Sequence, residues 1–429
     1  MLIYHEIMKN RLLCGVAAIA FAAVSMAQSG INSPYSQYGI GLLADQSQGF
    51  SRGMNGAGLG LRMGNVVNTL NPASYSAVDS LTMIFDMGIS GQVTNFKEGT
   101  VKVNAQNANL DYAVASFRLV PKVGMTIGLL PYSNMGYKYT VSKYLDSNNG
   151  TLTETYSGDG GIHKLVVGAG WQVTKPLSVG FNLSYLWGQL EHGMTTSSTT
   201  YINTLQRSYS VEVNSYALDL GAQWQQKLNT KDALTIGATV GIGHKLGADP
   251  TCQIINVSNA DTIPYVVSNG LSIPMTYSLG AAWTHDKKWT VDADLSMENW
   301  ANVDFPEIGN DGKYALQSGI LKNRYQVRLG ADFVPNFMDR HFLNRVHYRC
   351  GVGYTTPYYN INGKNGPKEY SVSAGFGIPL QNSYNNRSFL NVSAQFVRTS
   401  AKDMITENTF RLNIGLTFNE RWFAKWKID

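Results

Sequence analysis

The chain has 429 residues, and only 15% of them are charged, whereas 43 are glycine and 24 are tyrosine. Soluble proteins carry about 25% charged residues, so this composition points away from an ordinary soluble domain. The formal net charge of +5 is spread thinly, which argues against a nucleic-acid partner. Beyond the N-terminus, no apolar run approaches the roughly 20 residues that a spanning helix needs. A helical membrane protein is therefore excluded, and a closed β-barrel remains as the way to cross a bilayer with every backbone group hydrogen-bonded.

Residues 1–27 have the features of a secretory signal peptide, with two basic residues, an apolar run and a small-x-small cleavage site that ends at Ala27. We expect their removal and a mature chain that begins at Gln28. Two cysteines then remain, Cys252 in a predicted loop and Cys350 on a predicted strand. Their placement argues against a disulfide, and no role is assigned to either.

Residues 28–79 differ in pattern from everything after them. Small residues and glycines dominate, as in GFSRGMNGAGLGLRMGN, and the alternation of apolar and polar residues is absent. The segment therefore cannot supply membrane strands, yet it is too apolar for a disordered tail. Small side chains would let it fill the lumen of a barrel closely, so we expect an N-terminal plug over residues 28–79.

From residue 80 the chain becomes a series of fourteen alternating runs, an even number as closure of a bacterial barrel requires. The runs cover 81–93, 109–119, 122–132, 161–173, 177–191, 210–226, 232–246, 272–285, 287–300, 319–333, 346–356, 368–379, 387–399 and 408–419. Long polar connections, such as 133–160 and 192–209, alternate with short turns such as 174–176. This order predicts an all-β fold, a 14-stranded antiparallel transmembrane β-barrel over residues 80–419, with long extracellular loops and both termini periplasmic. A count of twelve or sixteen strands stays compatible with the sequence, because strand ends shift by several residues.

The hairpin over residues 288–333 shows the alternation most clearly. Every second residue of WTVDADLSM and of YQVRLGADF is apolar, which is the pattern of a strand with one lipid face and one wet face. If the two strands pair antiparallel, one register places Asp294 opposite Arg328 and Glu298 opposite Arg324. We therefore predict lumenal ion pairs at these positions. They either line a permeation path or hold the plug, or they only satisfy one another within the wall.

The final run, TFRLNIGLTF, is apolar on one face from Phe410 to Phe418. An aromatic residue at the end of the last strand resembles the signal that the outer-membrane barrel-assembly machinery reads in its substrates. Residues 420–429 form a periplasmic tail in which Trp422 and Trp426 stand among charges, which suits a membrane interface or a cap over the lumen. These features support closure of the barrel and an outer-membrane location in a Gram-negative cell.

Asn71, Pro72 and Ala73 stand in the Gly-rich segment that precedes the fourteen runs. This arrangement resembles the NPA motif in the hatch of FadL and TodX-type outer-membrane transporters of hydrophobic compounds, and in layout it is similar to their Bacteroidota branch. The resemblance covers the whole mature chain, although only the tripeptide is specific. It implies a hatch that blocks the lumen and is anchored by the motif. An ordinary Asn-Pro turn is the alternative for the tripeptide alone.

The same resemblance implies that a ligand leaves sideways, through a gap in the wall where the third strand is kinked. Here the third run contains Pro131, followed by Asn134 and Gly136. Proline cannot donate to a strand ladder, and the other two residues favour a bend or bulge. We therefore expect a lateral-opening kink at these positions, unless Pro131 merely ends the strand.

The six histidines of the mature chain lie in no motif typical of a hydrolase, a metal site or a redox site. The Gly-rich stretches at residues 39–41 and 56–60 lack the lysine and the strand-helix frame of a nucleotide-binding loop. We expect no enzymatic activity, no cofactor and no metal.

Two functions of different classes fit these expectations. The first, implied by the resemblance, is passive transport of a hydrophobic small molecule, fatty-acid-like or aromatic, across the outer membrane. The second is a structural or accessory subunit of an outer-membrane secretion or barrel-assembly complex, with envelope proteins as partners. A continuous apolar pocket inside the wall would favour transport, whereas a lumen filled by ion pairs and plug would favour the subunit.

Overall fold

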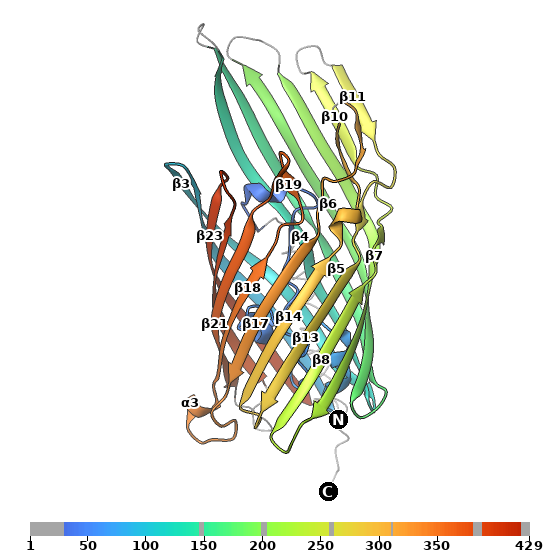
Figure 1. Ribbon diagram of the computed structural model, residues 1–429, viewed down its shortest axis with the longest axis vertical. Helices are drawn as coiled ribbons and strands as arrows, with labels where there is room; N and C mark the ends of the chain where they lie inside the picture. Colours follow the sequence, from blue (N-terminus) through green and yellow to red (C-terminus); the bar gives the residue numbers. More distant parts are fainter. Residues whose placement is uncertain are drawn as a thin grey trace, which may run out of the picture.

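A computed structural model describes residues 30–145, 150–198, 204–256, 261–309, 312–380 and 388–421. The predicted signal peptide and most of the predicted tail lie outside the described residues. A closed antiparallel barrel of fourteen strands dominates the fold (Figure 1), and the prediction of a 14-stranded all-β barrel is confirmed. The barrel strands are β2 (Thr82–Glu98), β3 (Val101–Val120), β4 (Val123–Leu145), β5 (Gly150–Gln172), β6 (Leu177–Ser198), β7 (Leu205–Lys227), β8 (Asp232–Gly241), β13 (Thr276–His285), β14 (Trp289–Glu298), β17 (Arg324–Phe333), β18 (His347–Thr355), β21 (Lys368–Leu380), β22 (Ser388–Ser400) and β23 (Thr406–Arg421). The first and last of them, β2 and β23, pair with each other and close the barrel.

The outer face of the barrel carries an apolar belt between two aromatic girdles, as expected for a surface in contact with lipid. Exposed leucines such as Leu279 and Leu295 lie between the girdles. The girdle near the short turns contains Trp171, Trp224, Trp283 and Trp289, and the girdle near the long loops contains Tyr185, Tyr216, Tyr277, Tyr325 and Tyr370. These two rings mark the interfaces of the membrane. Among the described residues, no helix is long and apolar enough to span a bilayer.

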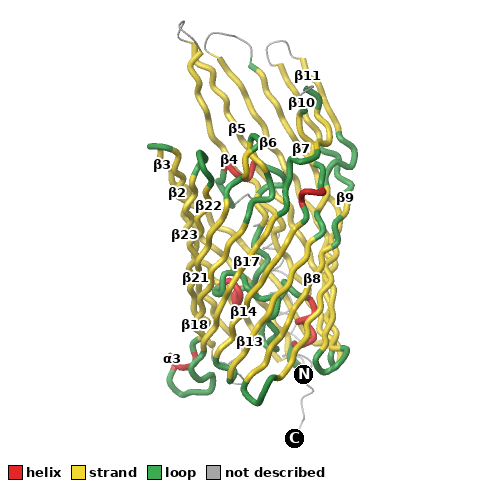
Figure 2. The backbone as a smooth tube through the Cα atoms, in the orientation of Figure 1, coloured by secondary structure: helices red, strands yellow, loops and turns green. Residues whose placement is uncertain are grey.

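Four strands extend far beyond the membrane at the long-loop end (Figure 1), where Figure 2 shows strand instead of loop. β4 to β7 are each 22 or 23 residues long, about twice the length that a membrane strand needs. The hairpin of β10 (Thr251–Asn256) and β11 (Asp261–Val266) adds to them by pairing with β7. The prediction of polar loops over 133–160 and 192–209 was therefore wrong, because most of these residues continue the strand pairing of the barrel.

The apolar and polar faces are reversed in this extension, which is why its alternation was not recognised as strand. Tyr139 and Tyr156 stack on the inner face with ring centroids 5.0 Å apart, and the Tyr139 hydroxyl bonds to Gln37 inside the barrel. Thr140 and Thr155 bond to each other on the outer face. An outer face of small polar residues belongs in water, so this part of the wall stands above the membrane.

The N-terminal segment, residues 30–79, lies inside the barrel, where Figure 1 shows it in dark blue. It consists of short elements: η1 (Pro34–Gln37), β1 (Leu42–Leu43), α2 (Gly49–Arg52) and η2 (Pro72–Ala77). Most of its side chains are buried, polar ones included. Its glycines and serines let the segment turn repeatedly within a narrow lumen.

Other short elements lie at the two ends of the barrel. At the long-loop end they are β9 (His244–Lys245), β12 (Ser272–Ile273), η3 (Trp300–Asn302), β15 (Phe305–Ile308), β16 (Tyr314–Gln317), β19 (Asn360–Ile361) and β20 (Lys364–Asn365), and at the short-turn end α3 (Phe342–Arg345). Several pack against η1 in a cluster of buried aromatic and aliphatic side chains that includes Tyr35, Trp300 and Tyr358. This cluster covers the lumen from the long-loop side.

Candidate functional site

The inner wall carries a row of glycines at the level of the N-terminal segment. In this row, residues that face each other on paired strands are both glycine along β4, β5, β6 and β7, between β8 and β13, and between β17 and β18. These glycines are Gly124, Gly170, Gly180, Gly221, Gly237, Gly280, Gly330 and Gly351. A Cβ atom at each of them would collide with the N-terminal segment, for example with the carbonyl of Tyr75, Pro72 or Leu59. The wall is therefore shaped to the backbone of this segment, which it holds at van der Waals distance around most of the barrel.

The predicted motif lies in the middle of this contact. Asn71 begins η2, and its side-chain oxygen accepts a hydrogen bond from the backbone N–H of Ala73 at 3.1 Å. Its amide nitrogen donates to the carbonyl of Leu59 and, across to β7, to the carbonyl of Ala222, both at 3.1 Å. Asn71 is fully buried, as are Pro72 and Ala73. Asn71 thus joins two turns of the segment to the wall, and its role as an anchor remains a prediction.

We expect Asn71→Ala to loosen the segment without unfolding the barrel. The change removes three hydrogen bonds and leaves two buried carbonyls without this donor, at roughly 1 kcal/mol for each bond. Hydrogen exchange of residues 59–76 in the detergent-solubilised protein should accelerate by about one to two orders of magnitude for that loss. Asn229→Ala, in the exposed turn between β7 and β8, serves as the control. Equal protection in both variants would refute the anchor.

The predicted register of the β14–β17 hairpin is confirmed, with Asp294 opposite Arg328 and Glu298 opposite Arg324. Glu298 and Arg324 form the predicted ion pair at 2.6 Å, and the Trp300 indole N–H also donates to Glu298, at 2.7 Å. Glu298 therefore links Arg324 of the wall to Trp300 of η3.

The second predicted pair, Asp294 with Arg328, was wrong, because the N-terminal segment supplies a partner to each side chain. The Asp294 carboxylate accepts from the backbone N–H groups of Gly58, at 2.7 Å, and Leu59, at 3.1 Å. Arg328 donates to the carbonyl of Gly56 at 3.1 Å. Charges that the sequence places opposite each other therefore hold the segment instead of each other.

Arg52, the last residue of α2, makes a buried ion pair that the sequence did not indicate. Its Nη1 lies 2.6 Å from an Asp111 carboxylate oxygen, and the two side chains are only 7% and 12% exposed. Asp111 falls at a bulge where β3 shifts register against β2, and it also accepts from the Ser90 hydroxyl at 2.9 Å. The bulge turns a carboxylate toward the lumen at a position that simple alternation would not assign to it.

A second buried cluster holds the start of α2. Phe50 lies under the guanidinium of Arg349, which is 3.9 Å from the ring centroid. Arg349 and His347 both bond to Asp332, at 2.9 and 2.8 Å. The backbone N–H of Gly49 donates to the Tyr112 hydroxyl at 2.7 Å. These wall residues come from β3, β17 and β18, and only the structure shows that they meet one short helix.

The predicted kink positions all contact the N-terminal segment. β3 and β4 pair only as far as Ala113 and Leu129, and the register of β4 against β5 shifts just beyond, between Pro131 and Ser133. The wall therefore has a seam between β3 and β4 above this point. The N-terminal segment fills it: Gln46 donates to the Pro131 carbonyl at 2.8 Å, Leu42 of β1 pairs with Asn134, and Gly136 donates to the Ser36 hydroxyl at 3.1 Å.

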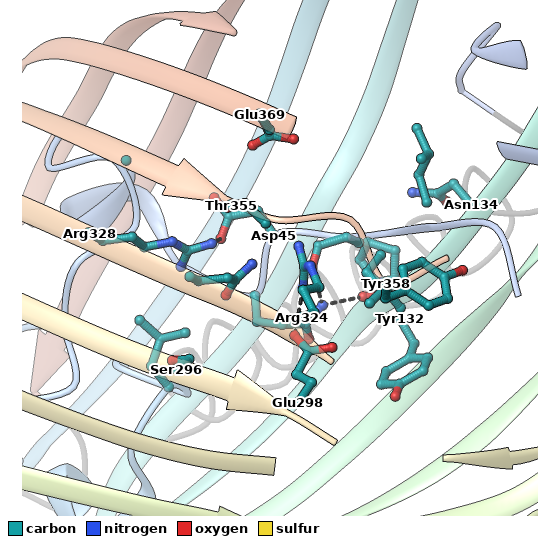
Figure 3. Close-up of a pocket in the computed structure, with 18 of the residues that line it drawn as sticks. Asp45, Tyr132, Asn134, Ser296, Glu298, Arg324, Arg328, Thr355, Tyr358 and Glu369 are labelled. Atoms are coloured by element: carbon teal, nitrogen blue, oxygen red, sulfur yellow. Dashed lines mark hydrogen bonds and ion pairs between the residues drawn. The ribbon is translucent and has the colours of Figure 1, made fainter. Parts of the chain in front are cut away.

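A cavity of about 430 Å³ lies between the segment and the covering cluster, and it reaches this seam. Figure 3 shows Arg324 beside Glu298 and Arg328 beside Asp45 in this cavity. Burial raises the pKa of Asp45, but Arg328, Arg52 and hydrogen bonds from Ser47 outweigh it and lower the pKa to about 2. The lining is rich in charge: Asp45, Arg52, Asp111, Lys164, Asp219, Asp294, Glu298, Arg324, Arg328, Glu369, Glu407 and Arg411. Within the described parts of the chain, no group of three or more His, Cys, Asp or Glu residues is placed to hold a metal.

The closed fourteen-strand wall with the N-terminal segment inside it has the fold of the FadL and TodX-type β-barrels. Solved structures of this fold include the toluene transporter TodX of Pseudomonas putida, 16% identical over 89% of this chain and 100% of that chain, with a TM-score of 0.59. The toluene transporter TbuX of Ralstonia pickettii is 13% identical over 88% of this chain and 99% of that chain (TM-score 0.58). A Pseudomonas aeruginosa FadL homologue is 12% identical over 89% and 99% (TM-score 0.62). At these identities the likeness concerns the fold.

By sequence, the chain belongs to the BamG family, whose model matches residues 8–429. No curated protein matches the chain.

Proposed function

We propose that this chain is a partner-binding subunit of an outer-membrane barrel-assembly complex, and that its own lumen conducts nothing. The observation that carries the proposal is the glycine row, which fits the wall to the backbone of the N-terminal segment. Contact so close around most of the barrel holds the plug in place, so no straight path through the lumen is open to a solute. A plug that stays in place becomes part of the fold.

Buried charged groups that bond between the wall and the N-terminal segment support a plug that stays in place, for an energetic reason. Arg52 with Asp111, and Asp294 with the backbone of Gly58, are buried contacts between charged groups and their partners. Separating a buried charge from its partner costs about 3–5 kcal/mol. Release of the segment would expose several such groups together, and neither the chain nor a passive ligand supplies an energy source of that size.

The chemistry of the cavity also speaks against a hydrocarbon ligand. Sites for hydrophobic molecules are lined mainly by apolar and aromatic side chains with few polar groups. This cavity instead mixes many charged side chains of both signs with apolar and aromatic ones such as Leu42, Tyr132 and Tyr358. The family name, BamG, agrees with a role in barrel assembly. The long-loop extension of β4 to β7 and the short turns at the opposite end of the barrel offer surfaces to which a partner could bind.

Passive transport of hydrophobic small molecules is the second candidate, and one observation favours it. The cavity reaches the seam between β3 and β4, where only the N-terminal segment closes the wall. TodX and TbuX, which are described as toluene transporters, share this fold. A similar ligand for this chain is part of the second candidate function alone.

A disulfide between β1 and β4, which would lock the N-terminal segment in the seam, separates the two candidates. Leu43 of β1 is the register partner of Ser133 on β4, a spacing that a disulfide can bridge. We expect Leu43→Cys/Ser133→Cys, when oxidised, to leave cell growth and co-purifying partners unchanged, because the seam is already closed. The reduced form of the same variant is the control. Loss of uptake of a labelled monoaromatic compound by oxidised proteoliposomes, restored by reduction, would instead establish transport.

Purification from outer membranes in mild detergent, followed by native mass spectrometry, tests the proposal directly. Stoichiometric envelope proteins bound to the barrel, with no small molecule inside it, are the expected result. A retained lipid-like molecule of defined mass, lost in the Asn71→Ala variant, and no bound protein would overturn the proposal.

A further inference from the structure

A second cavity, of about 320 Å³, lies at the long-loop end of β8, β13 and β14. Its wall is the segment of Ile273 and Pro274, which also lines the lumenal cavity on its other side. His244, at the cavity, stacks on Tyr216 with ring centroids 4.3 Å apart. Because Tyr216 is an exposed residue of the outer girdle, the cavity opens on the outer flank of the barrel and not into its lumen.

The height of this cavity relative to the membrane follows from strand register. Tyr277, Met297 and Tyr325 are register partners across β13, β14 and β17, and the two tyrosines belong to the outer girdle. Asn299 lies two residues beyond Met297, and its backbone N–H donates to the Met275 carbonyl at 2.9 Å. Tyrosine girdles mark the level of lipid headgroups. The cavity therefore begins where the headgroups of the outer leaflet lie.

The polar groups of the cavity are those that bind a sugar phosphate. Asn299 and Asn302 present amides, Ser272 a hydroxyl and Lys245 an ammonium group, and Asp304 adds one carboxylate that can accept from sugar hydroxyls. The buried Nε2 of His244 has no hydrogen-bond partner within the described residues. This nitrogen is closed off from the cavity, so a ligand would bond to it only after the ring had turned away from Tyr216.

We propose that this cavity binds the phosphorylated amino-sugar headgroup of an outer-leaflet glycolipid. Lys245 would receive the phosphate, and the amides of Asn299 and Asn302 the sugar hydroxyls. Acyl chains would continue down the apolar belt past Tyr216 and Tyr277. The site does not depend on the proposed function, because it lies outside the lumen, and a bound glycolipid would fix how the barrel sits among its lipid neighbours.

Native mass spectrometry of the full chain in detergent tests this site with three probes: monophosphorylated lipid A, phosphatidylethanolamine and free glucosamine 1-phosphate. We expect retention of lipid A, little retention of phosphatidylethanolamine and competition by glucosamine 1-phosphate. Lys245→Ala/Asn302→Ala should weaken lipid A retention roughly tenfold, because two exposed polar contacts are lost. Both side chains are exposed, so the barrel itself should be unaffected.

Lys402→Ala is the matched control, since Lys402 is an exposed lysine at the β22–β23 connection on the opposite side of the barrel. Its lipid A retention should equal that of the unmodified protein. Equal retention by the double variant would overturn the proposal. Binding of glucosamine 1-phosphate without retention of lipid A would also overturn it, because the source of the headgroup would then be a soluble sugar.

Discussion

Gly237→Val should loosen the N-terminal segment in its seat while the barrel persists. A Cβ at this position collides with the carbonyl of Leu59 and the side chain of Asn71. Overpacking of this kind costs about 3 kcal/mol or more, and here the obstacle is backbone that cannot rotate away. Valine itself suits a strand, so the wall should still form. Hydrogen exchange of residues 49–76 should accelerate roughly a hundredfold, which corresponds to that cost.

Conductance across a planar bilayer is the second readout for this variant. We expect the unmodified protein to be silent and Gly237→Val to open an aqueous path, because the lumen behind the segment is polar. Gly91→Val is the control: Gly91 faces outward on β2, and a Cβ there meets nothing within 4 Å. An unchanged exchange rate in Gly237→Val would show that the segment does not need the glycine row.

Arg52→Met should be the most destabilising single change among the charged residues of the N-terminal segment. It leaves the Asp111 carboxylate buried without its counter-ion, for which the expected loss is about 3–5 kcal/mol. The change keeps the length and the apolar stem of the side chain, so lost packing contributes little. The measurement is the denaturant midpoint of unfolding, followed by the difference in gel mobility between the folded barrel in unheated samples and the unfolded chain.

The double variant Arg52→Met/Asp111→Asn should recover most of that stability, because a neutral amide can still bond to Ser90 and no charge remains buried. Lys143→Met provides a matched control, since Lys143 forms an ion pair with Glu154 at 3.3 Å but is 62% exposed. Exposed pairs contribute little, so its midpoint should not move. A double variant as unstable as Arg52→Met would mean that the charge of Asp111 is not the cause.

The barrel itself could be predicted from the sequence because its signal is local. A strand between lipid and lumen alternates every second residue, and a hairpin joins neighbours in the chain, so the pattern of residues 288–333 was sufficient to predict the register of β14 and β17. The length of the strands that extend beyond the membrane was not predictable in the same way. Beyond the girdle at the long-loop end the wall is surrounded by water, so its outer face is polar and its inner face apolar, the reverse of the membrane part. The extended parts of β4 to β7 therefore resembled polar loops in the sequence.

The sequence by itself determined the class of fold, the membrane faces and the unusual character of residues 28–79, and it favoured the fourteen strands that the structure shows. Only the tertiary structure decided what that segment touches. Arg52 meets Asp111, Asp294 meets Gly58, and a glycine on each of several strands meets one backbone. Each of these contacts joins residues far apart in the chain, and the seat exists only after all fourteen strands have closed in register. Alternation states which way a side chain points, but it does not state what occupies the space in front of it.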